Sequence, residues 1–229
     1  MELTPGIHKI DSVKGANSYL VINKGTIIII DTGMPGNGKK ITDYIEGLGK
    51  GLQEVEYIVL THADIDHSGS VSELKEMTGA KVAIHQTDAP RLAGEKELKK
   101  VTGFIGLVFK LMMRLKKFQP VKPDILLKDG DKIGDLSVVY TPGHTEGSIS
   151  LYKAGEVIFV GDALMSDKDG NLRLPLSVMT LDMARAKKSI KKISELEFKD
   201  LLPGHGKPVL QNASEKVKDL SWKEMTHRN

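Results

Sequence analysis

The 229-residue chain contains no cysteine. It can therefore form no disulfide, offers no thiolate nucleophile and cannot hold zinc through sulfur, so any metal site must use nitrogen and oxygen ligands. Long apolar runs are also absent. The longest uncharged one, residues 101–109, is far shorter than the roughly 18 residues of a transmembrane helix. The N-terminus lacks a basic segment followed by an apolar one, so no secretion signal is visible. We expect a cytoplasmic protein without integral membrane association.

Neither sign of charge dominates the composition. The chain has 33 basic and 30 acidic side chains and a formal net charge of +3, which is small for this length. The charge therefore gives no reason to expect binding to nucleic acid or attraction of the whole molecule to a membrane surface. The length suits one domain that buries a large core without disulfides. We expect a single domain over residues 1–229 and no nucleic-acid partner.

The most informative stretch is residues 61–67, THADIDH, which follows an apolar run. It places two imidazoles and two carboxylates close together, at His62, Asp64, Asp66 and His67. Crowding like-charged carboxylates is costly unless a positive charge lies among them, and a divalent metal ion supplies that charge. The alternative is a solvated turn, because Asp, His and Ser are common in loops.

A related arrangement recurs along the chain: an apolar strand pattern ends in a glycine-containing turn that carries a histidine or an aspartate. It occurs at Asp31, His144, Asp162 and His205. Strand ends on one rim of a sheet can converge in space, so these side chains can meet. A solvated turn would have to recur independently at each place, which makes it a poor explanation of the whole set. For Asp31 taken alone, the alternative is that it caps the following turn.

Apolar patterns predict the elements around these turns. Two β-hairpins are expected, from residues 18–22 with 26–30 and from residues 149–152 with 156–160. Ser70 and Glu73 stand at the spacing of a capping box, which predicts that the 61–67 stretch lies between a strand and the N-terminus of a helix. Another helical pattern covers residues 181–196.

Three further histidines are given no role. His85 is expected to be an ordinary residue at a strand end. His8 and His227, near the two termini, are expected to be exposed to solvent.

Residues 88–124 do not follow this pattern of apolar strands that end in glycine-containing turns. The segment is both basic and apolar. The pattern predicts an inserted pair of amphipathic helices. One interpretation is structural, with charges facing water and methionines filling gaps in the core. The functional alternatives are a lid over an apolar substrate pocket, a homodimer surface, or a patch attracted to anionic lipid. A segment of this composition favours an anionic or lipophilic small-molecule substrate.

Taken in order, these motifs resemble those of the metallo-β-lactamase superfamily across nearly the whole chain. The matching segments are Asp31-Thr32-Gly33, residues 61–67, Thr141-Pro142-Gly143-His144-Thr145, Gly161-Asp162 and Pro203-Gly204-His205-Gly206. The resemblance implies an α+β fold, the four-layer αββα sandwich of the metallo-β-lactamase fold, in which two β-sheets lie face to face with helices outside. It also implies a dinuclear metal site on one rim.

The resemblance implies a role for each of these side chains. One divalent ion would be held by His62, Asp64 and His144, the second by Asp66, His67 and His205, and Asp162 would bridge the two. Asp31 matches the acid that supports the ligand loop in the family, and Asp66 and Asp31 are the implied catalytic residues. Zinc is the metal expected first, with iron or manganese as alternatives.

Asp64 departs from the usual motif of the family, which has histidine there. The replacement exchanges a neutral nitrogen ligand for an anionic oxygen. The first site becomes harder, which shifts its preference from zinc toward iron or manganese. The flavodiiron oxygen and nitric-oxide reductases of the same superfamily likewise carry a carboxylate there, a glutamate, and use iron.

Two functions follow from the resemblance. The first is a hydrolase in which a metal-bridging hydroxide attacks an ester, lactone, thioester or phosphodiester. The second is a di-iron redox protein acting on oxygen or nitric oxide, similar to a flavodiiron core without its flavin domain, which would need an outside electron donor. A scaffold that binds metal without turnover is the remaining alternative. Hydrolysis is preferred because it explains every motif without a further domain.

Overall fold

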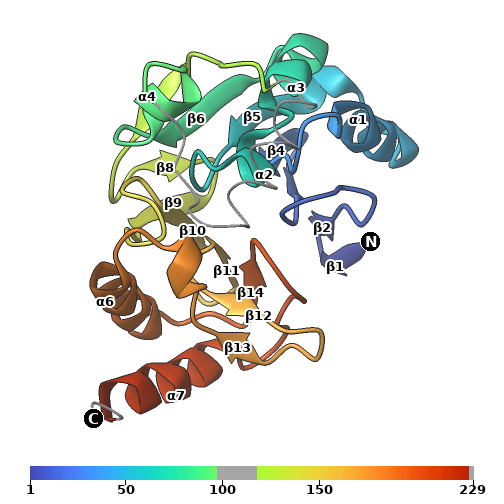
Figure 1. Cartoon of the computed structure of the whole chain (residues 1–229). Helices are drawn as coiled ribbons and strands as arrows, with labels where there is room; N and C mark the ends of the chain where they lie inside the picture. The colour runs from blue at the N-terminus through green and yellow to red at the C-terminus, as the bar shows by residue number, and fades with distance from the viewer. Residues whose placement is uncertain (97–117, 227–229) are drawn as a thin grey trace. The chain divides into compact units, whose positions relative to one another are not determined.

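A computed structural model of the chain describes residues 1–96 and 118–226. The chain divides into two compact units, residues 1–126 and 127–229, and each unit is described by itself (Figure 1). The prediction of a single domain stays a prediction, and the middle of the predicted insertion at residues 88–124 lies outside the described residues. None of the described helices combines the length and the apolar composition that crossing a membrane requires.

In the described part of the first unit, seven strands form one sheet in the order β1-β2-β3-β4-β5-β6-β7. They are β1 (Glu2–Thr4), β2 (Ile7–Lys9), β3 (Tyr19–Asn23), β4 (Thr26–Ile30), β5 (Val55–Val59), β6 (Lys81–His85) and β7 (Ile125–Leu127). Neighbours from β1 to β4 pair antiparallel, whereas β4, β5 and β6 run parallel. Parallel neighbours end at the same edge of a sheet, so the residues that follow β4 and β5 lie close together.

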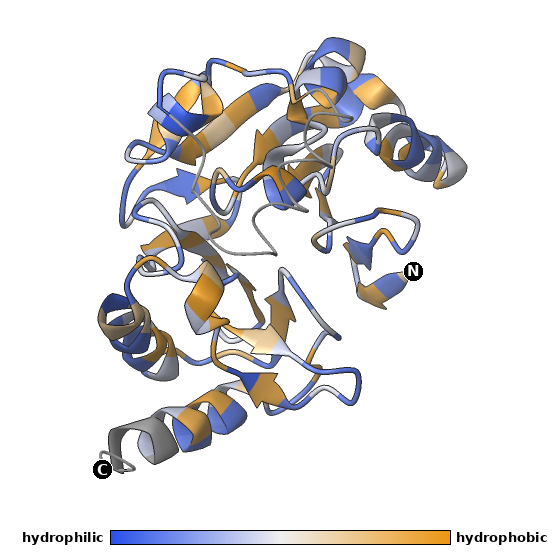
Figure 2. Ribbon diagram, viewed as in Figure 1, coloured by the Kyte–Doolittle hydropathy of each residue, from blue (hydrophilic) through white to orange (hydrophobic). Residues whose placement is uncertain are grey.

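Helices pack on the sheet of the first unit. They are α1 (Gly38–Gly47), the 3-10 helix η1 (Leu52–Glu54), α2 (Ile65–Ser68), α3 (Val71–Thr78) and α4 (Ala89–Leu92). Ile41 and Ile45 of α1 and Leu74 of α3 share one buried core with Ile27 and Ile29 of β4. Ile41 and Ile45 are four residues apart in the helix, and Ile27 and Ile29 are two residues apart in the strand. Residues at these spacings lie on one face of a helix or a strand, so the periodicity of the sequence determines which face each element buries. Figure 2 shows that the neighbouring strands β5 and β6 are also largely hydrophobic.

The described part of the second unit contains a five-stranded sheet in the order β14-β11-β10-β9-β8 and a ribbon of β12 and β13. The strands are β8 (Lys132–Ile133), β9 (Leu136–Tyr140), β10 (Ile149–Lys153), β11 (Val157–Gly161), β12 (Met165–Ser166), β13 (Leu172–Arg173) and β14 (Asp200–Pro203). β11 and β14 pair parallel, and the other neighbours pair antiparallel. The residues that follow β11 and β14 therefore lie at one edge of this sheet.

Two long helices, α6 (Met183–Ser194) and α7 (Ala213–Thr226), accompany the sheet of the second unit, with the 3-10 helix η2 (Ser177–Met179) before them. Ile190 and Ile193 of α6 and Val217 of α7 share a buried core with Ile158 and Val160 of β11. Each unit thus buries its own apolar helix faces against its own sheet.

Both predicted hairpins are confirmed, because β3 pairs with β4 and β10 pairs with β11 in antiparallel register. Lys24 and Gly25 form the first turn, both with positive φ (46° and 86°), which suits the twist of a tight hairpin. The helical pattern of residues 181–196 is confirmed as α6. This helix begins at Met183 because the Asp182 side chain accepts a hydrogen bond from a first-turn amide at 2.9 Å.

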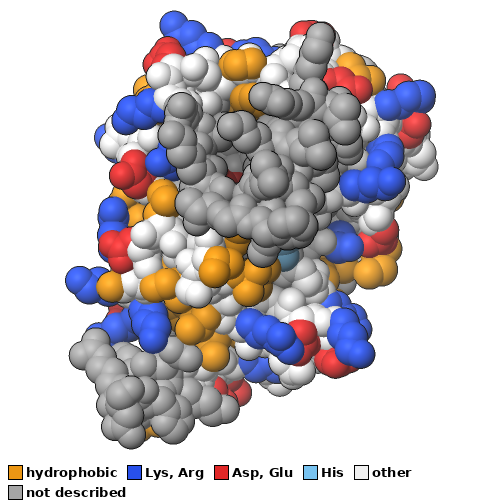
Figure 3. Space-filling view, viewed as in Figure 1, with side chains coloured by type: hydrophobic (Ala, Val, Ile, Leu, Met, Phe, Trp, Pro, Cys, Tyr) orange, Lys and Arg blue, Asp and Glu red, His pale blue; other side chains and the backbone are white. Residues whose placement is uncertain are grey.

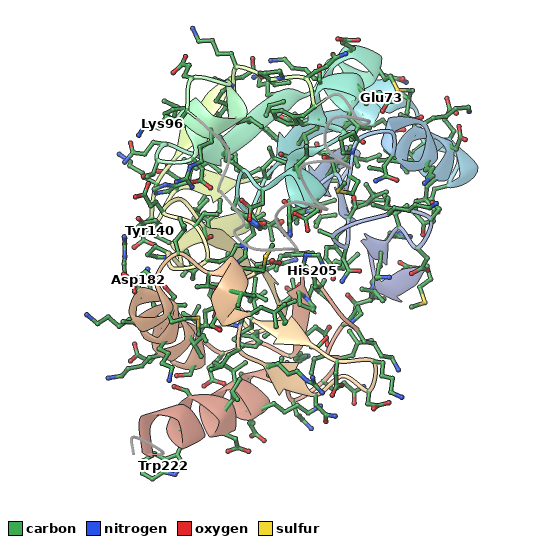
Figure 4. The ribbon with its side chains drawn as sticks, in the orientation of Figure 1. Glu73, Lys96, Tyr140, Asp182, His205 and Trp222 are labelled. Carbon is green, nitrogen blue, oxygen red and sulfur yellow. The ribbon has the colours of Figure 1, made fainter. Side chains whose placement is uncertain are left out.

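The predicted capping box of Ser70 and Glu73 is wrong. Neither side chain caps α3. The Ser70 hydroxyl donates to the Met34 carbonyl at 2.7 Å and accepts from the Asn37 amide at 2.8 Å, and the Glu73 carboxylate, labelled in Figure 4, accepts from the Gly38 amide at 3.0 Å. Both side chains therefore hold the turn that leads into α1, because the fold brings these backbone groups within their reach.

The prediction that His8 is exposed is also wrong. Its side chain is buried, and Nδ1 lies 3.2 Å from the Tyr44 hydroxyl. Burial disfavours the charged imidazole and lowers the pKa of His8, although the carboxylate of Glu2 opposes this effect. His227 lies outside the described residues.

Candidate metal centre

Residues 61–67 lie at the carboxyl end of β5, where the buried strand leads into a short loop and α2. Asp64 takes the N-cap position with an extended backbone (φ −62°, ψ 142°). Its carbonyl oxygen accepts hydrogen bonds from the amides of His67 and Ser68 at 3.0 and 2.9 Å, whereas its carboxylate makes no capping bond. The backbone therefore starts α2, and the Asp64 carboxylate is not used for capping it.

Asp31, the residue after β4, holds this loop through its buried carboxylate. Oδ1 accepts from the Thr61 amide, and Oδ2 accepts from the Thr61 hydroxyl and from His67 Nδ1, each at 2.8 Å. Asp31 has a φ of 56°, a left-handed conformation that Asp adopts more readily than most residues. Since β4 and β5 are parallel neighbours, the carboxylate reaches the start and the end of the 61–67 stretch at once.

These hydrogen bonds determine where two buried imidazoles carry their protons. The Thr61 hydroxyl has one hydrogen, which it donates to Asp31. Its oxygen, 3.0 Å from His62 Nδ1, therefore accepts the Nδ1 proton of His62. Asp31 likewise accepts the Nδ1 proton of His67. In each neutral ring Nε2 then carries the lone pair that a metal ligand needs. One carboxylate thus sets the same tautomer in both histidines.

The first unit brings its four predicted ligands together. The rings of His62 and His67 are 0% exposed, and their centroids lie 4.0 Å apart. His62 Nε2 lies 3.8 Å from Asp64 Oδ2, and Asp66 and His67 offer ligand atoms within 4.8 Å of each other. Two buried imidazolium ions at this distance would repel, whereas two neutral rings beside two carboxylates form a set of nitrogen and oxygen donors that fits a divalent metal.

Asp88 supports the same loop and was missed by reasoning from the sequence. It is buried, its Oδ2 accepts from the Ala63 amide at 3.0 Å, and its Oδ1 lies 3.5 Å from the Arg91 guanidinium. The signal in the sequence is an aspartate at the start of a short helix with an early proline, which predicts a cap. The fold instead turns the carboxylate toward Ala63.

In the second unit, His144 is carried by the turn after β9. Gly143 has a φ of 143°, and a Cβ at this position would collide with Ala186 of α6, so the close approach of turn and helix requires glycine. The chain before the helix also holds the turn, because the Asp182 amide donates to the Gly143 carbonyl at 3.0 Å and the Leu181 amide to the His144 carbonyl at 3.2 Å. These contacts fix the position of His144, which is buried.

Asp162 and His205 follow β11 and β14 at one edge of the same sheet. Asp162 Oδ2 lies 3.5 Å from His144 Nε2 and 3.6 Å from His205 Nε2. His205, labelled in Figure 4, is the most exposed of the three, with 28% of its side chain accessible. Gly206 has a φ of 95°, and a Cβ there would collide with the Ser166 carbonyl, so glycine lets this turn lie against β12. The second unit thus brings its three predicted ligands together, with Asp162 between the histidines.

The fold and these groups of predicted ligands indicate the class of protein. The profile described as "Metallo-beta-lactamase superfamily" matches residues 12–205, and the chain therefore belongs to the metallo-β-lactamase superfamily. The resemblance predicted from the motifs is confirmed.

Two relatives illustrate what this chain is similar to. The Bacillus subtilis (strain 168) protein named "Probable metallo-hydrolase YflN" is 30% identical over 230 residues, which cover 91% of this chain and 86% of that protein. The human protein named "Acyl-coenzyme A thioesterase MBLAC2" is 30% identical over 218 residues, covering 85% of this chain and 74% of that protein.

Solved structures agree on the fold. The metallo-beta-lactamase family protein TTHA1429 from Thermus thermophilus has a TM-score of 0.72 and 22% identity, with 97% of this chain and 80% of that chain covered. BJP-1, a subclass B3 metallo-beta-lactamase of Bradyrhizobium japonicum, has a TM-score of 0.70 and 24% identity, covering 98% and 91%. The predicted fold class, α+β with the αββα sandwich of the metallo-β-lactamase fold, is confirmed. Family membership and the donor groups place the chain among the metal-dependent hydrolases.

Proposed function

We propose that this chain is a dinuclear metal-dependent hydrolase that cleaves acyl thioesters of coenzyme A into a carboxylic acid and the free thiol. The observation that carries the metal-dependent part is the pair of buried histidines whose tautomers Asp31 sets. The thioester is chosen among the predicted esters, lactones, thioesters and phosphodiesters because the human relative, 30% identical to this chain, is named an acyl-coenzyme A thioesterase.

We propose the ligand sets that the resemblance implies: His62, Asp64 and His144 for one ion, Asp66, His67 and His205 for the other, and Asp162 for both. Two divalent ions held there would polarise the thioester carbonyl and lower the pKa of water. Asp31 and Thr61 act as positioning residues, because they hold the ring protons of the ligand histidines on Nδ1. Asp66 is partly accessible, and we assign it the second task of accepting a proton from the attacking water.

Asp64 bears on which metal the first site prefers. Its carboxylate lies beside His62, with 3.8 Å between Asp64 Oδ2 and His62 Nε2. An anionic oxygen ligand in place of a neutral nitrogen makes the first site harder. We propose zinc as the first metal to test, and iron and manganese as the alternatives.

The first experiment combines metal analysis with an activity assay. Protein purified without added metal is analysed for zinc, iron and manganese per chain, and hydrolysis of a short and a long acyl-coenzyme A is followed by a thiol reagent. Because the chain has no cysteine, the protein itself gives no signal with that reagent. About two zinc ions per chain together with thiol release would support the proposal. Two iron ions without thiol release would favour the redox alternative, which the relatives named above do not support.

Variants of the ligands test the same proposal. His67→Ala and Asp162→Ala are expected to lose most bound metal and most activity, because each removes a proposed ligand. His85→Ala is the control: this histidine is buried at the end of β6 and accepts a hydrogen bond from the Thr87 amide at 3.2 Å, and its replacement should leave metal content unchanged. Full turnover in both ligand variants would refute the site. The cytoplasmic location and the homodimer stay predictions.

A further inference from the structure

A basic groove lies beside the turn that carries His144. It has a volume of about 270 Å³ and is lined by Tyr140, Pro142, Arg185, Lys188, Ser189 and Lys192. Four of these residues belong to α6 and recur at spacings of three and four, so they share one face of the helix. Figure 3 shows Lys and Arg side chains at the left of the molecule, where Figure 1 places α6.

Two of the three cations of the groove, Lys192 and Arg185, have partners among the described residues. The Lys192 ammonium binds both carboxylate oxygens of Asp129, at 2.8 and 3.0 Å. The Arg185 guanidinium donates to the Tyr140 hydroxyl at 3.3 Å. Neither Arg185 nor Lys188 forms an ion pair with a carboxylate in residues 1–96 and 118–226, and both side chains are exposed. The groove therefore presents two positive charges that no described carboxylate neutralises.

The groove and the His144 turn share their contacts. The Ser189 hydroxyl donates to the Pro142 carbonyl at 2.7 Å, and the amide of Asp182, at the start of α6, donates to the Gly143 carbonyl at 3.0 Å. Figure 4 labels Tyr140 and Asp182, which lie near each other where β9 ends and α6 begins. A ligand in the groove would thus contact the same turn that carries a proposed metal ligand two residues further on.

We infer that this groove binds the phosphate groups of coenzyme A. It would thereby hold the coenzyme A part of the proposed substrate, whose thioester is cleaved at the proposed metal centre. The inference rests on the proposed function. A guanidinium matches the geometry of phosphate oxygens with two parallel hydrogen bonds, and an ammonium adds a point charge. The tyrosine and proline rings add apolar surface beside these charges. The carboxylates of Asp129 and Asp182 also lie near, but each already accepts a hydrogen bond, from Lys192 and from the Arg185 amide.

The test compares two double variants with equal loss of charge. Arg185→Ala with Lys188→Ala removes the two unneutralised cations of the groove. Lys187→Ala with Lys191→Ala removes two exposed cations of the same helix that do not line the groove. Binding of coenzyme A, and of pantetheine as its phosphate-free portion, is measured by calorimetry on the full chain. We expect the groove variant to bind coenzyme A at least about tenfold more weakly, because charged hydrogen bonds are lost, and the control to stay within about twofold.

A kinetic arm uses two thioesters with the same acyl group, one on coenzyme A and one on N-acetylcysteamine, which carries no phosphate. The groove variant should raise KM for the first and leave kcat and KM for the second unchanged. Unchanged coenzyme A binding in the groove variant, or equal weakening in both double variants, would overturn the inference. If the wild-type chain hydrolyses neither thioester, the proposed function fails, and the calorimetry alone still decides whether the groove binds the phosphates.

Discussion

Replacing Asp31 by asparagine should weaken both metal binding and folding. The carboxylate accepts three hydrogen bonds, one at Oδ1 from the Thr61 amide and two at Oδ2 from the Thr61 hydroxyl and His67. Asparagine has one amide oxygen and one amide nitrogen. If the asparagine oxygen takes the Oδ2 position, the amide nitrogen faces the Thr61 amide. In the reverse orientation, the amide nitrogen faces the Thr61 hydroxyl and His67 Nδ1. While both rings keep their protons on Nδ1, at least one donor therefore points at another donor in either orientation. The reverse orientation is relieved only if His62 and His67 move their protons to Nε2, and this removes the lone pairs that a metal ligand needs.

The magnitude follows from these contacts. One unsatisfied buried donor costs about 1–3 kcal/mol, and the bond to His67 loses its charge, which is worth about 1 kcal/mol more. We expect the metal-free Asp31→Asn protein to lose about 1–4 kcal/mol of unfolding free energy, with the lower end applying when both rings move their protons to Nε2. Metal affinity should fall about 10- to 100-fold, because the residue that orients the proposed ligand histidines is lost. This loss corresponds to about 1.4–2.7 kcal/mol.

Two measurements separate these effects. Urea unfolding in the presence of a chelator gives the stability of the metal-free protein, and a competitive chelator titration gives the zinc affinity. Asp200→Asn is the matched control: Asp200 is also buried, but its Oδ1 accepts one amide hydrogen bond, from Gln211 at 2.9 Å, which an asparagine oxygen can keep. This control should change stability by less than about 1 kcal/mol and leave zinc affinity unchanged. Zinc affinity within about twofold of wild type in Asp31→Asn would refute the reasoning.

Three further predictions concern other parts of the chain. Asp64→His should raise zinc affinity, since imidazole suits zinc better than a lone carboxylate; an unchanged zinc titration would count against Asp64 as a ligand. Gly206→Ala should lower the unfolding free energy in urea by about 2 kcal/mol or more, because residue 206 has a φ of 95° and the new Cβ would collide with a β12 carbonyl. Gly155→Ala is the control. Residue 155 has a φ of 70° but open space around it, so this replacement should cost about 1 kcal/mol. Burial opposes ionisation of Asp124, but hydrogen bonds from Lys75 and the β6 backbone outweigh it and hold the pKa of this carboxyl below its usual 3.8. Because the pKa is lower in the folded than in the unfolded protein, the Asp124 carboxylate stabilises the fold by about 0.5–1 kcal/mol. This stabilisation is present above about pH 4 and is lost as the pH falls further. The unfolding free energy of Asp124→Asn in urea should therefore vary less between pH 5 and 3 than that of wild type.

The sequence by itself determined the family, the fold and the elements that local patterns encode. The turns that carry the proposed ligands could be found because each follows an apolar strand and combines His or Asp with glycine within a few residues. The two hairpins could be found for the same reason: strand periodicity and turn chemistry act between neighbours in the chain.

Only the tertiary structure decided which groups these side chains contact. Ser70 and Glu73 stand at the spacing of a cap, yet they bind the turn before α1. Asp88 reaches the Ala63 amide, and His8 is buried although it lies near the N-terminus. Each partner is more than 20 residues away in sequence, for example 25 residues between Asp88 and Ala63. No local pattern specifies such a pair.

The tautomers of His62 and His67, two proposed ligands, likewise depend on contacts that the local sequence does not specify. Thr61 stands in the motif, but its role depends on Asp31, which is 30 residues away in sequence and comes within hydrogen-bond distance because β4 and β5 are parallel neighbours. The sequence alone therefore predicts which residue types form the site. Which nitrogen of each ring carries its proton is decided by the packing of two strands, because a hydrogen bond requires its partners within about 3 Å of each other.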